Sequence, residues 1–293
     1  MSPGRSMFAR VTIVGVGLIG GSFALALRAA RVVDEIVVFD RDPGSAERAL
    51  HLGIADRIES SIAAAVRGAE LVVLAVPVAR TADVLAAIVP HLAADAIVTD
   101  VGSTKVSVIA AARAVLGDAI TRFVPGHPIA GRAVHGPDAA QVDLFRGKRV
   151  LLTPLPENGD AVVAQVEAAW RACGARVDRI DATTHDAVLS AVSHLPHLLA
   201  YALVAQIADA PDAELKFSLS GGGFRDFTRI AASSPEMWRD VTLANRDALL
   251  NDLDAYRAGL DRLRGWVAAG DGDALETLFT HASAARTRLA DPR

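Results

Sequence analysis

Short apolar runs alternate with Ala-rich stretches of helical spacing over the first 180 residues of the chain. Most of the runs are nearly continuous in Val, Ile and Leu, as expected for strands that are buried on both faces of a sheet. This alternation predicts βαβ units, and therefore a doubly wound parallel sheet with helices on both faces. The predicted helices include residues 18–30, 81–92 and 105–116, and the predicted strands are residues 10–14, 35–40, 70–76, 96–101, 122–125, 149–153 and 176–180.

The strand pattern stops after Asp181, and helical spacing takes over. Thr183 and Thr184 are suitable helix caps before an apolar stretch that ends near Ala208. Pro196 lies inside this stretch and is expected to kink the helix, because proline removes a helix hydrogen bond. We therefore predict a first domain over residues 1–181 and an all-helical second domain over residues 182–293.

Further signals divide the helical part. The glycines at 221–223 break the pattern, and Ser234-Pro235 is typical of an N-cap followed by proline at the first helical position. From Leu249 onward, apolar residues recur at alternating intervals of four and three, which predicts a long helix packed along another helix. Asp271 is placed to cap a last helix that reaches Leu289.

The segment 195–208 is apolar on more than one helix face. A helix that is apolar all round is usually buried. A helical domain of about 110 residues offers a limited core in which to bury it. We therefore expect the helical domain to form a homodimer.

Composition narrows the class of protein. The 293 residues suit two domains, and 52% apolar with 22% charged residues is typical of globular chains. A net charge of −4 argues against a general nucleic-acid or acidic-membrane binder. The single cysteine, Cys173, excludes an intrachain disulfide and a zinc site with several thiolates. Because the start lacks an apolar signal core and residues 198–208 are shorter than a membrane span, we expect a soluble, cytoplasmic protein. Because the sequence ends near residue 293, we expect no appended regulatory domain.

A glycine motif, Gly15-Val16-Gly17-Leu18-Ile19-Gly20, lies between a predicted strand and a predicted helix. This context is typical of a dinucleotide site, in which the first glycine forms the turn, the second lets the pyrophosphate approach and the third lets helix and strand pack closely. Asp40 ends the next predicted strand, where a carboxylate can bind the ribose hydroxyl and so favours NAD. Arg41 could instead pair with a 2′-phosphate, so NADP remains open, and FAD or another nucleotide is the alternative ligand. The predicted cofactor-binding residues are Gly15, Gly17, Leu18, Ile19, Gly20, Asp40, Arg41 and Val76.

Two more motifs follow predicted strands, Asp100-Val101-Gly102-Ser103-Thr104-Lys105 and Gly126-His127-Pro128-Ile129-Ala130-Gly131. Strands of an open α/β sheet deliver such residues to the ligand crevice. Taken alone, Ser103 is explained as a helix N-cap and His127 as a turn residue before a proline. Together the two motifs favour a site.

Five motifs give a more specific resemblance. GVGLIGGS, DVGSTK, GHPIAG, SHLPH (193–197) and GGGFRDFTRIAASSPEMWRD (221–240) follow one another as in the prephenate/arogenate (cyclohexadienyl) dehydrogenase family, which the chain resembles from about residue 11 to residue 289. The resemblance implies a Rossmann domain followed by an all-helical dimerisation domain. It also implies NAD-dependent oxidative decarboxylation of prephenate or arogenate, in tyrosine biosynthesis.

The resemblance also assigns roles to single residues. His127 would take the proton of the substrate hydroxyl, which suits an imidazole whose pKa is near neutral, and Ser103 would orient His127 or that hydroxyl. Arg229 and His197 would bind the substrate, whose two carboxylates need cationic partners. Arg225 lies one helical turn before Arg229 and would share its face, or would pair with Asp226 instead.

Other polar residues receive plainer interpretations. His194 is expected to be a hydrogen-bonded supporting residue, and Trp238 and Met237 to pack between helices. Lys105 is expected to be a solvated or structural charge, and no metal site is expected, because His194 and His197 lack a third ligand. Ala133 stands where the family often carries an acidic residue, so any gating or amine-recognition role of that position is in doubt here.

Two other functions remain open at this point. One is a β-hydroxyacid-type dehydrogenase, which would rely on a lysine near the nicotinamide and would not need the arginines of the FRDFTR segment. The other is a catalytically silent NAD-binding sensor, which would bind the cofactor and turn over no ring substrate.

Overall fold

The computed structural model describes residues 6–132 and 134–290, and the chain divides into two compact units, residues 1–246 and 247–293. The predicted division after residue 181 stays a prediction: strands end at Arg179, but the compact units divide at residue 246.

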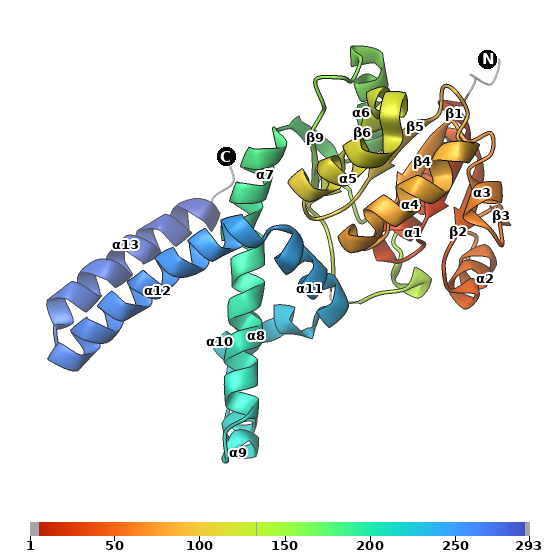
Figure 1. Cartoon of the computed structure of the whole chain (residues 1–293). Coiled ribbons are helices and arrows are strands. Elements are labelled where there is room, and N and C mark those ends of the chain that lie inside the picture. The colour runs from red at the N-terminus through yellow and green to blue at the C-terminus, as the bar shows by residue number, and fades with distance from the viewer. Residues whose placement is uncertain (1–5, 133, 291–293) are drawn as a thin grey trace. The chain divides into compact units, whose positions relative to one another are not determined.

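A six-stranded parallel sheet forms the centre of the first unit, with the strand order β3-β2-β1-β4-β5-β6 (Figure 1). The order reverses between β1 and β4, and in open α/β sheets ligands bind beyond the carboxyl ends of the strands at such a point. The predicted doubly wound parallel sheet is therefore confirmed. Its strands are β1 (Phe8–Val14), β2 (Val33–Phe39), β3 (Arg57–Ile58), β4 (Leu71–Leu74), β5 (Ile97–Asp100) and β6 (Phe123–Val124).

Helices cover both faces of this sheet, because successive residues of each strand point to opposite faces. In β4, Leu71 and Val73 join a core with residues of α1 and α6, whereas Val72 and Leu74 join a second core with residues of α4 and α5. The helices are α1 (Leu18–Ala30), α2 (Pro43–His51), α3 (Ile62–Ala65), α4 (Thr81–Ile88), α5 (Val106–Leu116) and α6 (Asp160–Ala172).

A second, three-stranded sheet was not expected from the sequence. It contains β7 (Gly126–Pro128), β8 (Arg149–Leu152) and β9 (Arg176–Arg179), with β7 antiparallel to β8 and β8 parallel to β9. The segments predicted at 149–153 and 176–180 are strands, but they do not extend the main sheet. Pro125 lies between β6 and β7, and a proline cannot donate to a ladder, so the chain leaves one sheet and enters the other there.

After β9 the first unit continues with helices only, beginning with α7 (Ala182–Leu189). Asp181 caps α7 by accepting a 2.9 Å hydrogen bond from the backbone N of Thr184. The cap is therefore two residues before Thr183 and three before Thr184, the caps that the sequence predicted. A π-helical turn, Ser190–His194, joins α7 to α8 (Leu195–Ala208). The interruption predicted at Pro196 thus takes the form of a wider turn immediately before it, which is a common feature of helices at functional sites.

The 27-residue helical stretch Ala182–Ala208 is long and apolar enough, by length and composition, to cross a membrane. Core helices of soluble proteins pass the same test, and this stretch carries the buried polar side chains of His185, Asp186 and His194. Only 22% of its most apolar 18-residue window is buried within the chain. Much of its apolar surface is therefore left uncovered.

Short helices complete the first unit, and two long helices make up the second. α9 (Ala213–Ser218) and α10 (Gly222–Thr228) precede a 3₁₀ turn (Arg229–Ala232) and α11 (Pro235–Ala244), which Ser234 caps as predicted. α12 (Arg246–Ala269) and α13 (Gly272–Ala290) fold back on each other (Figure 1), and Asp271 caps α13 as predicted.

Candidate active site

The glycine loop between β1 and α1 has the backbone of a phosphate-binding turn. Gly15 has φ +94°, and a Cβ added there would lie 2.4 Å from the carbonyl oxygen of Ala75. A Cβ on Gly20 would lie 2.2 Å from the carbonyl oxygen of Gly15, so the helix can start this close to the strand only with glycine. By contrast, no atom lies within 4 Å of a Cβ placed on Gly17, and no side chain caps α1. The N-terminus of α1 therefore faces open space that suits a pyrophosphate.

Asp40 lies beside this loop, one residue after β2. Its Oδ2 accepts a 2.8 Å hydrogen bond from the backbone N of Val16, and its Oδ1 accepts a 2.9 Å bond from that of Asp42. The half-buried carboxylate is thereby held at the position where a ribose hydroxyl would donate to it, whereas Arg41 is exposed.

The remaining predicted cofactor residues line the same loop. Leu18 and Ile19 direct their side chains into the core, so only their backbone N–H groups are available to a ligand. Val76 follows β4, and its Cγ1 lies 3.3 Å from a Cβ placed on Gly15. The residues present therefore fit a dinucleotide, with a glycine turn, an open helix N-terminus and a ribose acceptor.

A buried ion pair holds the strand ends next to His127. Lys105 is fully buried, and its Nζ donates to Oδ2 of Asp100 (2.5 Å) and to the backbone O of Gly126 (2.7 Å). Asp100 in turn accepts a 3.1 Å hydrogen bond from the backbone N of Gly126. Burial lowers the pKa of Lys105, and the nearby carboxylates of Asp100 and Asp186 oppose that shift. The expectation of a solvated lysine is wrong, and the structural interpretation of Lys105 is the one that the contacts support.

The N-terminus of α5 is capped by a residue of another helix. The carboxylate of Asp186 in α7 accepts hydrogen bonds from the backbone N of Lys105 (2.7 Å) and of Val106 (2.9 Å). Ser103, which the sequence offered as the cap, does not cap α5, and its hydroxyl forms no hydrogen bond with any residue in the described part of the chain. That hydroxyl remains available to a ligand.

Two histidines connect this cap to β7. Nδ1 of His185 lies 2.7 Å from Oδ1 of Asp186, and Nε2 of His185 lies 3.0 Å from Nδ1 of His127. His185 is fully buried, whereas His127 is half-buried. The pKa of His127 is lowered well below its usual value, first because the ring is buried and then because His185, Lys105 and His194 lie near it. These surroundings favour the neutral form of His127.

His194 is held by the amide of Asn245. Nδ2 of Asn245 donates to Nδ1 of His194 (3.0 Å) and to the backbone O of Asp186 (2.8 Å). Burial lowers the pKa of His194 to about 4, while Asp186 and the backbone of Ser103 oppose the shift. His194 is thus a neutral, hydrogen-bonded supporting residue, and the backbone of Ser103 lies close enough to affect its pKa.

His197 and Arg229 form the outer part of the site. The imidazole of His197 stacks on Trp238, with ring centroids 3.5 Å apart, and its Nδ1 lies 2.8 Å from the backbone O of Ser193. Burial lowers the pKa of His197, and the positive charge of Arg229 lowers it further. Arg229 itself is exposed, and it forms no ion pair with a residue that the structure describes.

Two predicted features are not brought into this cluster. Arg225 is exposed, and it forms neither the predicted ion pair with Asp226 nor another ion pair within residues 6–132 and 134–290. Ala133 lies outside the described residues. In those same ranges no group of three or more His, Cys, Asp or Glu residues is arranged to hold a metal ion.

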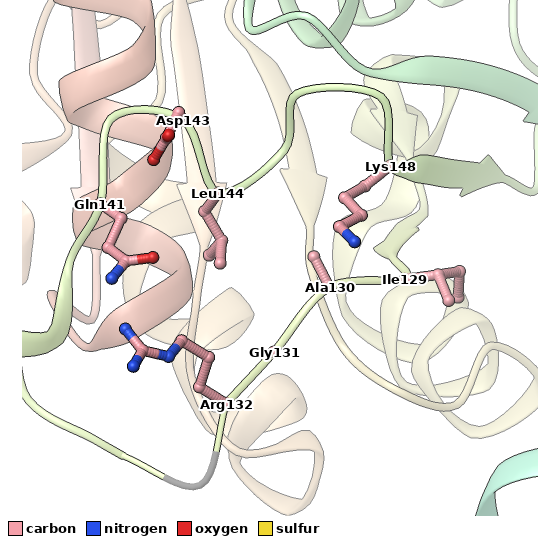
Figure 2. A pocket seen from close by; sticks show the side chains of 8 residues that line it. All are labelled: Ile129, Ala130, Gly131, Arg132, Gln141, Asp143, Leu144 and Lys148. Carbon is pink, nitrogen blue, oxygen red and sulfur yellow. The ribbon is translucent and has the colours of Figure 1, made fainter.

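A pocket of about 410 Å³ opens where the chain continues from β7. Figure 2 shows Arg132 and Gln141 approaching each other from facing segments, with Lys148 on the far side. The backbone N of Gln141 donates to Oγ of Ser22 in α1, so this loop is anchored beside the glycine turn. The pocket is lined by Ile129, Ala130, Gly131, Arg132, Gln141, Asp143, Leu144 and Lys148.

Comparison with known proteins gives the family. Residues 23–179 match the family model described as prephenate dehydrogenase, nucleotide-binding domain, and residues 181–281 match the prephenate dehydrogenase dimerization domain. The chain belongs to the prephenate dehydrogenase family. This confirms the resemblance that the five motifs indicated.

Individual members of the prephenate dehydrogenase family match along most of their length. A cyclohexadienyl dehydrogenase from Zymomonas mobilis is 38% identical, over 97% of each chain, and a prephenate dehydrogenase from Bacillus subtilis is 35% identical, over 95% of this chain and 76% of that protein. The crystal structure of prephenate dehydrogenase from A. aeolicus, in complex with hydroxyphenyl propionate and NAD⁺, aligns with a TM-score of 0.89 and 34% identity, covering 96% of this chain and 98% of the other.

Proposed function

We propose that this chain oxidises and decarboxylates prephenate with NAD, giving 4-hydroxyphenylpyruvate, with arogenate as the alternative substrate and tyrosine as its product. The observation that carries the proposal is the environment of His127, an imidazole in β7 whose pKa is lowered and whose Nδ1 lies 3.0 Å from Nε2 of His185, in a chain that also has an intact dinucleotide cradle. The family of the chain supports the same reaction.

The open N-terminus of α1 and the carboxylate of Asp40 would hold NAD, which would supply the acceptor for the hydride on the ring carbon that bears the hydroxyl. His127 accepts the hydroxyl proton as that carbon becomes a carbonyl. The bond to the ring carboxylate then breaks, its electron pair makes the ring aromatic, carbon dioxide leaves, and the ring oxygen regains a proton as a phenol. A positioned base of this kind contributes about 10²–10⁴-fold, and Ser103, with its unengaged hydroxyl, orients the reacting hydroxyl.

Arg229 and His197 bind a substrate carboxylate in this proposal. Arg229 is exposed without a carboxylate partner in the described part of the chain, and it is close enough to His197 to lower the pKa of that ring. A guanidinium can bind a carboxylate through two parallel hydrogen bonds. Arg225, one turn earlier, is the second candidate on the same helical segment.

The β-hydroxyacid-type alternative needs a lysine that reaches the nicotinamide. Lys105 does not suit that role, because its Nζ is fully buried and donates to Asp100 and to the backbone O of Gly126. No observation on the site favours this alternative.

The direct test is turnover by the purified chain. With NAD and prephenate or arogenate we expect NADH to form, and we expect less turnover with NADP because the carboxylate of Asp40 repels a 2′-phosphate.

His127→Asn is expected to lower kcat by at least about 10²-fold with substrate binding largely kept, because the base is lost. An unchanged kcat in His127→Asn would show that His127 is not the base. If the parent chain forms neither NADH nor NADPH with either substrate, the proposed function is wrong and the silent NAD-binding sensor is the remaining alternative.

Arg229→Ala tests the proposed carboxylate contact. We expect KM to rise by about 10- to 100-fold with little change in kcat, since a hydrogen bond to a charged group contributes about 1.5–3 kcal/mol to binding of ground and transition state alike. Arg176→Ala, which removes an exposed arginine of β9, is the matched control and should leave KM unchanged. An unchanged KM in Arg229→Ala would assign carboxylate recognition to another residue.

We also propose that the helical residues after 181 assemble the chain as a homodimer. The apolar stretch Ala182–Ala208 is mostly uncovered within one chain, and the family model over residues 181–281 is described as a dimerization domain. Light scattering is expected to give about twice the chain mass of 30.6 kDa. A mass of one chain at micromolar concentration would contradict the dimer.

A further inference from the structure

His185 connects a buried carboxylate to His127. The three side chains form one row: Oδ1 of Asp186 lies 2.7 Å from Nδ1 of His185, and Nε2 of His185 lies 3.0 Å from Nδ1 of His127. His185 comes from α7 and His127 from β7, 58 residues apart in sequence. The first part of the row is closed to solvent, because the side chain of His185 is 0% exposed.

The partners of Asp186 determine where the protons lie along this row. Its carboxylate already accepts hydrogen bonds from the backbone N of Lys105 and of Val106, and an ionised carboxylate can only accept. Nδ1 of His185 must therefore carry a proton and donate it. When His185 is neutral, its other nitrogen, Nε2, has a lone pair and accepts.

The same reasoning extends to His127. Because Nε2 of His185 accepts, Nδ1 of His127 must donate, and the remaining nitrogen of neutral His127, Nε2, has no proton. His127 can act as a base in this tautomer, because the free lone pair is on Nε2, the nitrogen that does not contact His185. If the proton were on Nε2, His127 would be unable to accept one from a substrate hydroxyl there.

We propose that His185 is a positioning residue that holds the proton of His127 on Nδ1 and leaves Nε2 ready to accept the proton of the substrate hydroxyl. The proposal rests on the proposed function of His127 as the base.

The neighbours of His127 leave this role to His185. The other groups that face His127 are Lys105 and His194. Lys105 donates its Nζ protons to Asp100 and to the backbone O of Gly126, and Nδ1 of His194 is occupied by the amide of Asn245. Lys105 has no lone pair to offer while it is charged. Among the described residues, His185 is therefore the acceptor for Nδ1 of His127.

The row also favours the proton-transfer step itself. When His127 takes the hydroxyl proton it becomes an imidazolium with a proton on each nitrogen. Its Nδ1–H then donates to a ring that is backed by the carboxylate of Asp186, which stabilises the new positive charge in a site of low polarity. Burial otherwise disfavours that charge, as the lowered pKa of His127 shows.

Two variants of different reach separate this role from a structural one. The amide of His185→Asn replaces Nδ1 and keeps the bond to Asp186, but it does not reach His127. The longer His185→Gln places an amide oxygen near the former Nε2, where it can again accept from His127. His91→Asn, on the 3₁₀ turn Val89–His91, is the control for loss of an imidazole elsewhere.

The readout is the single-turnover rate of NADH formation with prephenate, together with KM for prephenate and Kd for NADH. We expect His185→Asn to lower the rate by about 10- to 100-fold or more, the range for loss of an orienting partner of a catalytic or ligating histidine. KM and Kd should stay within about 2-fold, because neither ligand contacts His185. His185→Gln should recover most of the rate, and His91→Asn should match the parent.

Each other result overturns the proposal. A parental rate in His185→Asn would show that the second histidine does not position the first. A loss of rate that is accompanied by an equal loss of NADH affinity, and that His185→Gln does not restore, would assign His185 to structure alone. If the parent chain turns over neither prephenate nor arogenate, it is the proposed function that fails, which this experiment distinguishes because the parent is measured first.

Discussion

The carboxylate of Asp186 is a buried charge, and burying a charge is costly unless hydrogen bonds compensate it. Here the backbone N–H groups of Lys105 and Val106 and the imidazole of His185 supply them, and the partial positive charge of the α5 N-terminus adds to their effect. A single side chain thus joins α7 to α5. Removing one partner of such a buried charge typically costs about 3–5 kcal/mol, so the two helices are held in one arrangement.

From that arrangement the rest of the site follows. Asn245 donates to the backbone O of Asp186 and to the ring of His194. The buried pair of Lys105 and Asp100 binds the backbone O and N of Gly126, the residue immediately before His127. Packing of Trp238 against His197 of α8 holds that ring near Arg229. The proposed base His127, the cofactor cradle and the proposed carboxylate-binding Arg229 therefore come from three different parts of the first unit.

The sequence predicts what local chemistry determines. Gly15, Gly17 and Gly20 needed only the strand before them and the helix after them, and His127 was found from its place after a strand. Asp186 and His185 were missed, because their partners Lys105 and His127 are 81 and 58 residues away in sequence. The available signal was the polar pair His185-Asp186 immediately before the apolar residues of the same helix, because a buried polar group must have a partner. The second sheet was missed because strand pairing is non-local and Pro125 hides the change of sheet.

The central claim is that neutral His127 carries its proton on Nδ1. Nitrogen-15 shifts of the histidine rings, measured on the labelled parent at pH 7.5 and assigned to His127 by comparison with His127→Asn, test it most directly. The account predicts a protonated Nδ1 and an unprotonated Nε2 for this ring. A ring with its proton on Nε2, or with protons on both nitrogens at that pH, would contradict it.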